Sequence, residues 1–139
     1  MRRNWNSATV RLTSNEREAA NRAEVTALLI PAGFRVYRPE ADCYGEDLIL
    51  RTPDGELLTV QMKGRPQVDW HKYGGQSLWM LFPEPGCVAG RRWFLVPHDE
   101  LYSWTKGKHG RAPRWNEIWS YPSISKELRN FLEKFVVAP

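Results

Sequence analysis

Two short apolar runs separated by a turn give the clearest pattern of hydrophobic and polar positions in this chain. The runs cover residues 48–50 and 57–60, and residues 53–55 between them read Pro-Asp-Gly. Apolar and β-branched runs that flank such a turn are typical of a β-hairpin. The pattern therefore predicts a hairpin with a three-residue loop, in which Thr52 lies opposite Glu56.

This register divides the hairpin into a polar and an apolar face. It places Asp47 opposite Gln61, and Lys63 follows two residues later on the same face. Side chains alternate along a strand, and directly opposed Cβ atoms lie about 4.5–5.5 Å apart, so an acid, an amide and a lysine converge at the open end of the hairpin. The other face is expected to belong to the core and carries Leu48, Leu50, Leu58, Val60 and Met62.

A helix is expected over residues 15–30. Residues 13–15 read Thr-Ser-Asn and supply capping oxygens, acids follow in the first turn, and residues 31–33 read Pro-Ala-Gly and end it. At 100° per residue, the apolar stripe of this helix is formed by Val25, Leu28, Leu29 and Ala32.

Glu18 falls on the centre line of that stripe, seven residues before Val25. Burying a lone carboxylate is costly unless a cation or a metal neutralises it, so Glu18 is a candidate metal ligand or a partner for Lys63. Glu24, at the edge of the stripe, is the second choice. The alternative interpretation of Glu18 is a solvent-exposed acid that complements the helix dipole.

Three further apolar runs predict strands at residues 34–38, 77–82 and 92–96. Together with the hairpin they predict an α/β fold, with a mixed central β-sheet of about five strands flanked by helices. Residues 66–75 are expected to form a loop, and residues 124–137 a terminal amphipathic helix.

The remaining segments carry weaker patterns. Residues 1–13 are expected to form an irregular arm or a short strand, and a short helix should open near His98 with Asp99 as its cap. Residues 106–114 are expected to form a basic loop, a second candidate surface for nucleic acid.

Length and composition fit one domain over residues 1–139, with enough bulk for a core. No run approaches the roughly 18 apolar residues that cross a bilayer, and residues 1–10 lack a signal-peptide pattern, so we expect a cytoplasmic protein. Cys43 and Cys87 lack metal-site spacing and are expected to be reduced thiols. The net charge of +4 permits a nucleic-acid partner.

The acid at Asp47 followed by a Gln-x-Lys motif at Gln61 and Lys63 resembles the signature of the PD-(D/E)XK nuclease superfamily, with Gln in place of the usual Glu. The order of elements over residues 15–100 is similar to that of Holliday-junction resolvases: a Glu-bearing helix, a short strand after Gly-Phe, then the hairpin. In those families the helix acid would stand nearer position 22, which is Arg here.

This resemblance implies a restriction-endonuclease-like fold and a Mg²⁺- or Mn²⁺-dependent endodeoxyribonuclease that hydrolyses DNA phosphodiester bonds, with branched or damaged DNA as candidate substrates. Resolvases act as dimers, so a homodimer is implied if both strands are cut. The alternative is a nuclease-fold module without cleavage, which binds nucleic acid or a protein partner.

The expected chemistry assigns a role to each candidate residue. Hard oxygen ligands suit Mg²⁺, and we expect Asp47, the Gln61 carbonyl and Glu18 to supply them. Lys63 would stabilise charge on the phosphate or orient the attacking water, which completes a catalytic set of these four residues. Gln in place of Glu removes one negative charge, so the metal should be held more loosely.

Cations mixed with aromatic residues follow the predicted catalytic strand. Cations contact phosphates and aromatic faces stack on bases. The candidate nucleic-acid-binding residues are Arg65, Lys72 and Tyr73.

Overall fold

The computed structural model of this protein describes residues 11–41, 46–86 and 90–137. Most of the predicted N-terminal arm, residues 1–10, lies outside these ranges. Cys43 and Cys87, expected to be reduced thiols, also lie outside the described residues.

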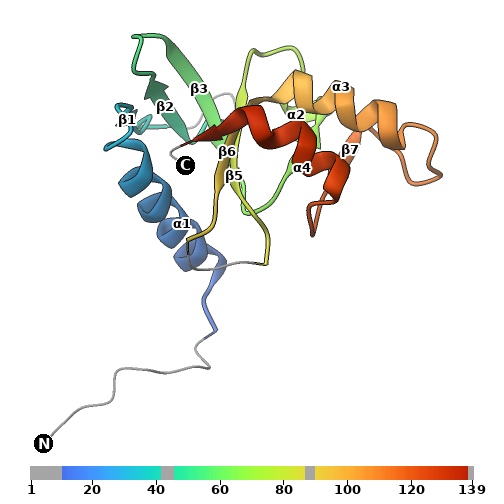
Figure 1. Cartoon of the computed structure of the whole chain (residues 1–139), viewed down its shortest axis with the longest axis horizontal. Coiled ribbons are helices and arrows are strands. Elements are labelled where there is room, and N and C mark those ends of the chain that lie inside the picture. The colour runs from blue at the N-terminus through green and yellow to red at the C-terminus, as the bar shows by residue number, and fades with distance from the viewer. Residues whose placement is uncertain (1–10, 42–45, 87–89, 138–139) are drawn as a thin grey trace, which may run out of the picture.

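Helices and strands are mixed along the described chain, with four strands in direct succession after the first helix (Figure 1). In chain order they are α1 (Ser14–Leu29), β1 (Arg35–Tyr37), β2 (Leu48–Arg51), β3 (Leu57–Met62), β4 (Gln67–Asp69), α2 (Trp70–Tyr73), β5 (Trp79–Pro83), β6 (Trp93–Pro97), α3 (His98–His109), β7 (Ile118–Ser120), α4 (Lys126–Leu132), the 3₁₀ turn η1 (Glu133–Phe135) and β8 (Val136–Val137). Among the described helices, none is both long and apolar enough to cross a membrane.

Six of the described strands form a curled mixed sheet in the order β1-β2-β3-β5-β6-β8. Strands β1, β2 and β3 are antiparallel, β5 runs parallel to β3, and β6 and β8 continue antiparallel. A separate two-stranded sheet pairs β4 with β7. The predicted mixed α/β architecture is confirmed, and the main sheet exceeds the expected five strands because β8 pairs with β6.

The predicted hairpin and its register are confirmed. Leu50 pairs with Leu58 and Leu48 with Val60. At the turn, the Thr52 backbone N–H donates to the Glu56 carbonyl at 2.8 Å. The apolar face is buried as expected: Leu48, Leu50, Leu58, Val60 and Met62 are all 6% exposed or less.

Helix α1 begins where its capping residues predict. The Thr13 hydroxyl accepts from the Glu16 backbone N–H at 3.1 Å, and the Glu16 carboxylate accepts from the Thr13 N–H at 2.9 Å. This reciprocal pair satisfies two of the N–H groups that lack partners at a helix start. Val25 and Leu29 are fully buried, whereas Ala32 lies beyond the end of the helix and is exposed, so it was wrongly assigned to the stripe.

Apolar side chains pack on both faces of the main sheet. Helix α1 covers one face over β2, β3 and β6, and the core there includes Val25, Leu29 and Trp93. Helices α3 and α4 cover the opposite face over β5 and β6, with Phe82 and Phe94 at its centre. Figure 1 shows α1 on one side of the sheet and α3 with α4 on the other.

Several predicted boundaries were wrong. The expected loop at residues 66–75 contains β4 and α2, because its polar and aromatic residues pair with β7 and pack under α3. The expected helix at 124–137 is divided among α4, η1 and β8, since the chain end adds a strand to β6. Helix α3 extends into the expected loop at 106–114 and ends at His109.

Asp99 is not the cap of α3. The cap position is Pro97, which makes no side-chain hydrogen bond to the helix. The Asp99 carboxylate instead accepts from the Gly75 backbone N–H at 3.0 Å and contacts the His98 ring at 2.9 Å. It joins the loop after α2 to the start of α3.

Candidate functional site

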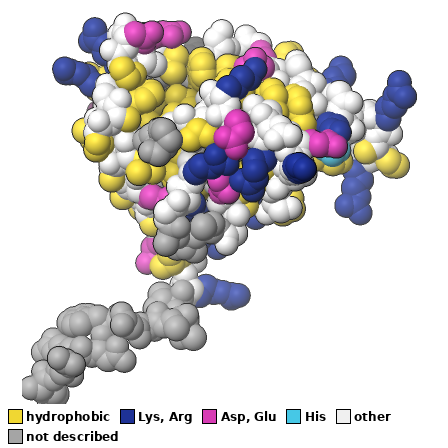
Figure 2. All heavy atoms as spheres, viewed as in Figure 1, with side chains coloured by type: hydrophobic (Ala, Val, Ile, Leu, Met, Phe, Trp, Pro, Cys, Tyr) yellow, Lys and Arg dark blue, Asp and Glu magenta, His cyan; other side chains and the backbone are white. Residues whose placement is uncertain are grey.

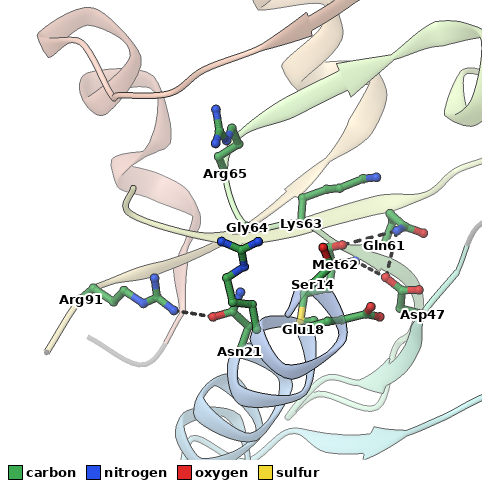
Figure 3. Close-up of a pocket in the computed structure, with 11 residues that line it drawn as sticks. Ser14, Glu18, Asn21, Asp47, Gln61, Met62, Lys63, Gly64, Arg65 and Arg91 are labelled. Atoms are coloured by element: carbon green, nitrogen blue, oxygen red, sulfur yellow. Dashed lines mark hydrogen bonds between the residues drawn. The ribbon is translucent and has the colours of Figure 1, made fainter. Parts of the chain in front are cut away.

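A pocket of about 720 Å³ lies where the first turns of α1 meet the end of β3. Figure 3 shows side chains from the helix, the hairpin and the loop after β3 around it. Its lining residues are Ser14, Arg17, Glu18, Asn21, Asp47, Gln61, Met62, Lys63, Gly64, Arg65 and Arg91. The structure thus brings together the four predicted catalytic residues and the predicted phosphate contact Arg65.

Asp47 and Gln61 are joined directly at the open end of the hairpin. The Gln61 side-chain amide donates to Asp47 Oδ2 at 2.9 Å, and the same oxygen accepts from the Met62 backbone N–H at 3.0 Å. The carboxylate therefore also satisfies a backbone donor that β2 does not reach. The predicted opposition of Asp47 and Gln61 is confirmed by this contact.

The amide group of Gln61 has one satisfied end and one unsatisfied end. Its residue is 9% exposed, and Oε1 is buried with no hydrogen-bond partner in the described part of the chain. Its NH₂ group faces Asp47, because the opposite orientation would set two oxygens against each other. A buried amide oxygen without a partner destabilises the folded state by about 1–3 kcal/mol.

Lys63 follows on the same strand and is half-buried. Its ammonium lies 5.5 Å from the centroid of the Tyr73 ring, within the range of a cation–π contact. Tyr73 itself is only 5% exposed and packs in the core under α3. The ring predicted to stack on a base is therefore buried and fixes Lys63 instead.

Glu18 lies on the pocket side of α1, but its expected burial was wrong. Its side chain is 50% exposed and pairs with Arg22, one turn later, at 3.1 Å. Figure 3 shows Glu18 extending from α1 toward the side of the pocket that holds Asp47. The carboxylate stays exposed because this part of α1 borders the pocket and not the apolar face of the sheet.

Three pocket residues on α1 were missed in the sequence. Ser14, Arg17 and Asn21 join Glu18 at spacings of three, four and seven residues, which is one face of a helix. This polar stripe continues in phase into the apolar residue Val25. The change of character along one face was the available signal that the first half of the helix covers a pocket and the second half a core.

Glu24, the second choice for a metal ligand, belongs to a different cluster. Its carboxylate accepts from Arg91 through two nitrogens at 2.8 Å and from Trp93 Nε1 at 2.6 Å. The hydrogen bond from Arg91 lowers the pKa of Glu24, with burial opposing it. Arg91 also donates to Asn21 at 2.7 Å and lines the pocket, so this cluster fixes α1 against β6 beside the site.

The residues predicted to contact nucleic acid do not all lie at the pocket. Arg65 is exposed and lines the pocket, and Lys72 is exposed on α2. The basic segment at 106–114 lies instead near an aromatic cluster in which His109 stacks on Trp119 at 4.5 Å. It contributes no residue to the pocket beside Asp47.

The donor atoms of the pocket fit a hard divalent cation incompletely. Asp47 and Glu18 offer carboxylate oxygens and Gln61 offers its unpartnered Oε1, a set of the kind that Mg²⁺ takes together with several waters. To share a cation with Asp47, the Gln61 amide would have to rotate. Within the described ranges, no group of three or more His, Cys, Asp and Glu side chains could hold a metal ion.

The pocket is therefore a mixed site, with two carboxylates, one buried amide and a surrounding set of cations at positions 17, 63, 65 and 91. Comparison with known proteins adds no relative: no protein-family model, no curated protein and no solved structure matches this chain.

Proposed function

We propose that this protein is a metal-dependent endonuclease that hydrolyses DNA phosphodiester bonds in the pocket between α1 and the hairpin. The observation that carries the proposal is the direct contact of the Gln61 side-chain amide with the Asp47 carboxylate, together with the buried Gln61 Oε1, which has no partner among the described residues. Once the amide has rotated, a cation held by these two residues would satisfy that oxygen and would supply the metal that phosphodiester hydrolysis uses.

The order of elements also supports the proposal. A helix that carries Glu18 precedes a short strand and then the hairpin with Asp47 and Gln61, as in the PD-(D/E)XK nucleases that the sequence resembles. The six-stranded mixed sheet is compatible with a restriction-endonuclease-like core.

The electrostatics of the pocket suit a polyanion. Three cations, Arg17, Lys63 and Arg65, line it beside the two carboxylates, whereas the fourth, Arg91, is already paired with Glu24. Lysine and arginine contacts to phosphates provide a large share of the affinity of proteins for DNA, so these cations would draw the backbone of a strand into the pocket.

Each residue has a part in the proposed reaction. Asp47, Gln61 and Glu18 would hold Mg²⁺ or Mn²⁺, which supplies Lewis-acid polarisation of the phosphate and a more acidic water. Lys63, held over Tyr73, would place its ammonium against the charge that develops on the phosphate. Arg65 would bind the neighbouring phosphate.

The direct test is nicking of supercoiled plasmid and cleavage of four-way junctions with Mg²⁺ or Mn²⁺, with EDTA as the blank. Lys63→Ala should lower the cleavage rate by at least about a hundredfold while DNA binding weakens much less. Metal-independent nicking, or equal nicking by Lys63→Ala, would trace the activity to a contaminant or another site.

A second candidate function is nucleic-acid binding without cleavage. It is favoured by the contact between Gln61 and Asp47, because an amide that donates to the carboxylate occupies a position where a second metal-binding acid would stand. Tight DNA binding that is unchanged by EDTA, with no cleavage of any tested substrate, would favour this alternative.

A further inference from the structure

We propose that Arg35 and Arg51 form a phosphate-binding site for the DNA backbone at the turn end of the hairpin, distant from the Asp47 pocket. The inference rests on the proposed function in one respect, since it takes the ligand to be DNA. It is carried by an independent feature, the direct opposition of two arginines across a pair of strands.

Arg35 on β1 and Arg51 on β2 are Cα partners in the antiparallel register, and both are exposed. Opposed Cβ atoms in such a pair lie about 4.5–5.5 Å apart, and like charges placed directly opposite each other destabilise a sheet. Neither guanidinium forms an ion pair or hydrogen bond with another described residue. The pair thus places two positive charges side by side, and neither forms an ion pair within the described part of the chain.

The two arginines line a hollow of about 460 Å³ together with Gly33 and residues 52–55. Gly33 and Gly55 have φ values of +98° and +91°, and a Cβ on Gly33 would lie 3.3 Å from Pro53. The positive φ values favour glycine at both positions, and the turn depends on them.

One acid borders the hollow and is already engaged. The Asp54 carboxylate accepts a hydrogen bond from the Thr52 hydroxyl within the turn. This hydrogen bond lowers the pKa of Asp54, so the carboxylate stays ionised and the hollow holds two positive charges and one negative charge. Paired guanidinium groups bind phosphate through several parallel N–H···O contacts, and arginine suits this geometry better than lysine.

The two arginines lie on the sheet face that points away from α1. Leu48 and Leu50 point into the core under α1, so Arg51, one position later, points to the opposite face. Arg35 lies beside Arg51 on that face, and Tyr37, 47% exposed, follows two residues later. Figure 2 shows Lys or Arg side chains next to Asp or Glu side chains at the edge of the molecule where the hairpin turn lies.

The spacing between the two sites suits one duplex. Arg51 stands four positions after Asp47, which is about 14 Å at roughly 3.4 Å per extended residue. Successive base pairs of B-DNA are also about 3.4 Å apart, so a duplex that lies along the hairpin would carry a phosphate to the hollow about four base pairs from the scissile bond.

The test is the affinity of the cleavage-blocked Asp47→Asn protein for a labelled 24-base-pair duplex, measured over a range of salt concentrations. Adding Arg35→Gln and Arg51→Gln should raise the Kd at least about tenfold at 0.1 M salt and lower the salt slope by about one or more. The matched control adds Arg38→Gln and Lys126→Gln, which remove the same charge from two exposed positions outside the hollow. The control should change the Kd less than threefold.

Thermal unfolding separates a binding role from a structural one. Removal of two opposed like charges should leave the melting temperature unchanged or raise it at low salt. A fall in melting temperature, or equal Kd values for the two double variants, would overturn the site. Cleavage by the wild type with unaltered DNA binding by the hollow variant rejects this inference and leaves the proposed function standing. Weaker DNA binding by the hollow variant, with no cleavage by the wild type, supports the phosphate-binding site and rejects the proposed endonuclease function.

Discussion

The side-chain amide of Gln61 donates a hydrogen bond to the Asp47 carboxylate across the open end of the hairpin, at 2.9 Å. The same carboxylate oxygen accepts the Met62 backbone N–H at 3.0 Å. Asp47 thus contributes both to the structure of the strand end and to the candidate site. Variants at this position must separate the two contributions.

We expect Asp47→Asn to abolish cleavage and to leave the melting temperature within a few degrees of the wild type. The asparagine oxygen can still accept the Met62 N–H, whereas the charge that would hold a metal is lost. Asp47→Ala should be less stable by about 1–3 kcal/mol, because it leaves that N–H without a partner. Urea unfolding and plasmid nicking measure the two effects. Equal destabilisation by the two variants would contradict this account of Asp47.

We expect Gln61→Glu to destabilise the metal-free protein and to bind Mg²⁺ more tightly. The change replaces an amide that donates to Asp47 by a second carboxylate, so two like charges meet at a partly buried position. A divalent cation would relieve that repulsion. The measurement is the rise in melting temperature on addition of MgCl₂, which should exceed that of the wild type. If the rise is no larger, Gln61 lies outside the metal shell.

We expect Glu18→Gln to reduce the Mg²⁺-induced rise in melting temperature with little change in stability without metal. The Glu18 side chain is half-exposed, and its ion pair with Arg22 is of the one-turn kind that contributes about 0.5 kcal/mol or less. Arg22→Gln is the matched control, since it breaks the same pair and keeps the carboxylate. A metal response lost equally in both variants would mean that the ion pair matters and not the ligand.

The sequence predicted the hairpin well because its signals are local. The turn residues set the loop, and alternation within a few residues sets both faces, so the opposition of Asp47 and Gln61 followed. The position of α1 along the sheet is not local. Helical phase correctly directed Glu18 to the same side as Val25, but only tertiary packing decides which turns of that face meet a core and which border a pocket.

Two strands were not predicted because they too depend on tertiary contacts. Strands β7 and β8 have only three and two residues, and they exist because β4 and β6 offer edges to pair with. Such short segments carry too little alternation to be recognised from pattern alone. Tyr73 was misassigned for a related reason, since an aromatic residue among cations fits a binding surface and a core equally well until its burial is known.

We expect Glu24→Gln to destabilise the protein by about 1 kcal/mol at pH 7 and to leave the Mg²⁺ response intact. The loss of unfolding free energy is small because the Glu24 side chain is about a third exposed, at 32%, and solvent screens its ion pair. Arg91 lowers the pKa of Glu24 in the folded state, so this contribution is present above the unfolded pKa near 4.5 and is lost as the pH falls toward the folded value. Urea unfolding of both proteins should therefore show a difference at pH 7 that narrows below pH 4.5. Glu56→Gln, at an exposed acid, is the control and should show no such difference.

The side chain of His98 is fully buried beside α2. Its Nε2 accepts the Asp69 backbone N–H at 3.0 Å, so the ring proton lies on Nδ1 and is donated to Asp99 at 2.9 Å. Burial lowers the pKa of His98, against the opposing effect of the Asp99 carboxylate.

Because the folded pKa of His98 lies below the unfolded value of about 6.5, the unfolded chain binds more protons as the pH falls through that window. The free energy of unfolding should therefore decrease as the pH falls below about 6.5 and level off below the folded pKa. In His98→Gln, a side-chain oxygen can still accept the Asp69 N–H. We expect this variant to be less stable at pH 7 by about 1–2 kcal/mol and to lose the part of the pH dependence that the histidine causes. His71→Gln, at an exposed histidine, should keep the wild-type slope. An unchanged slope in His98→Gln would show that another group titrates in this range.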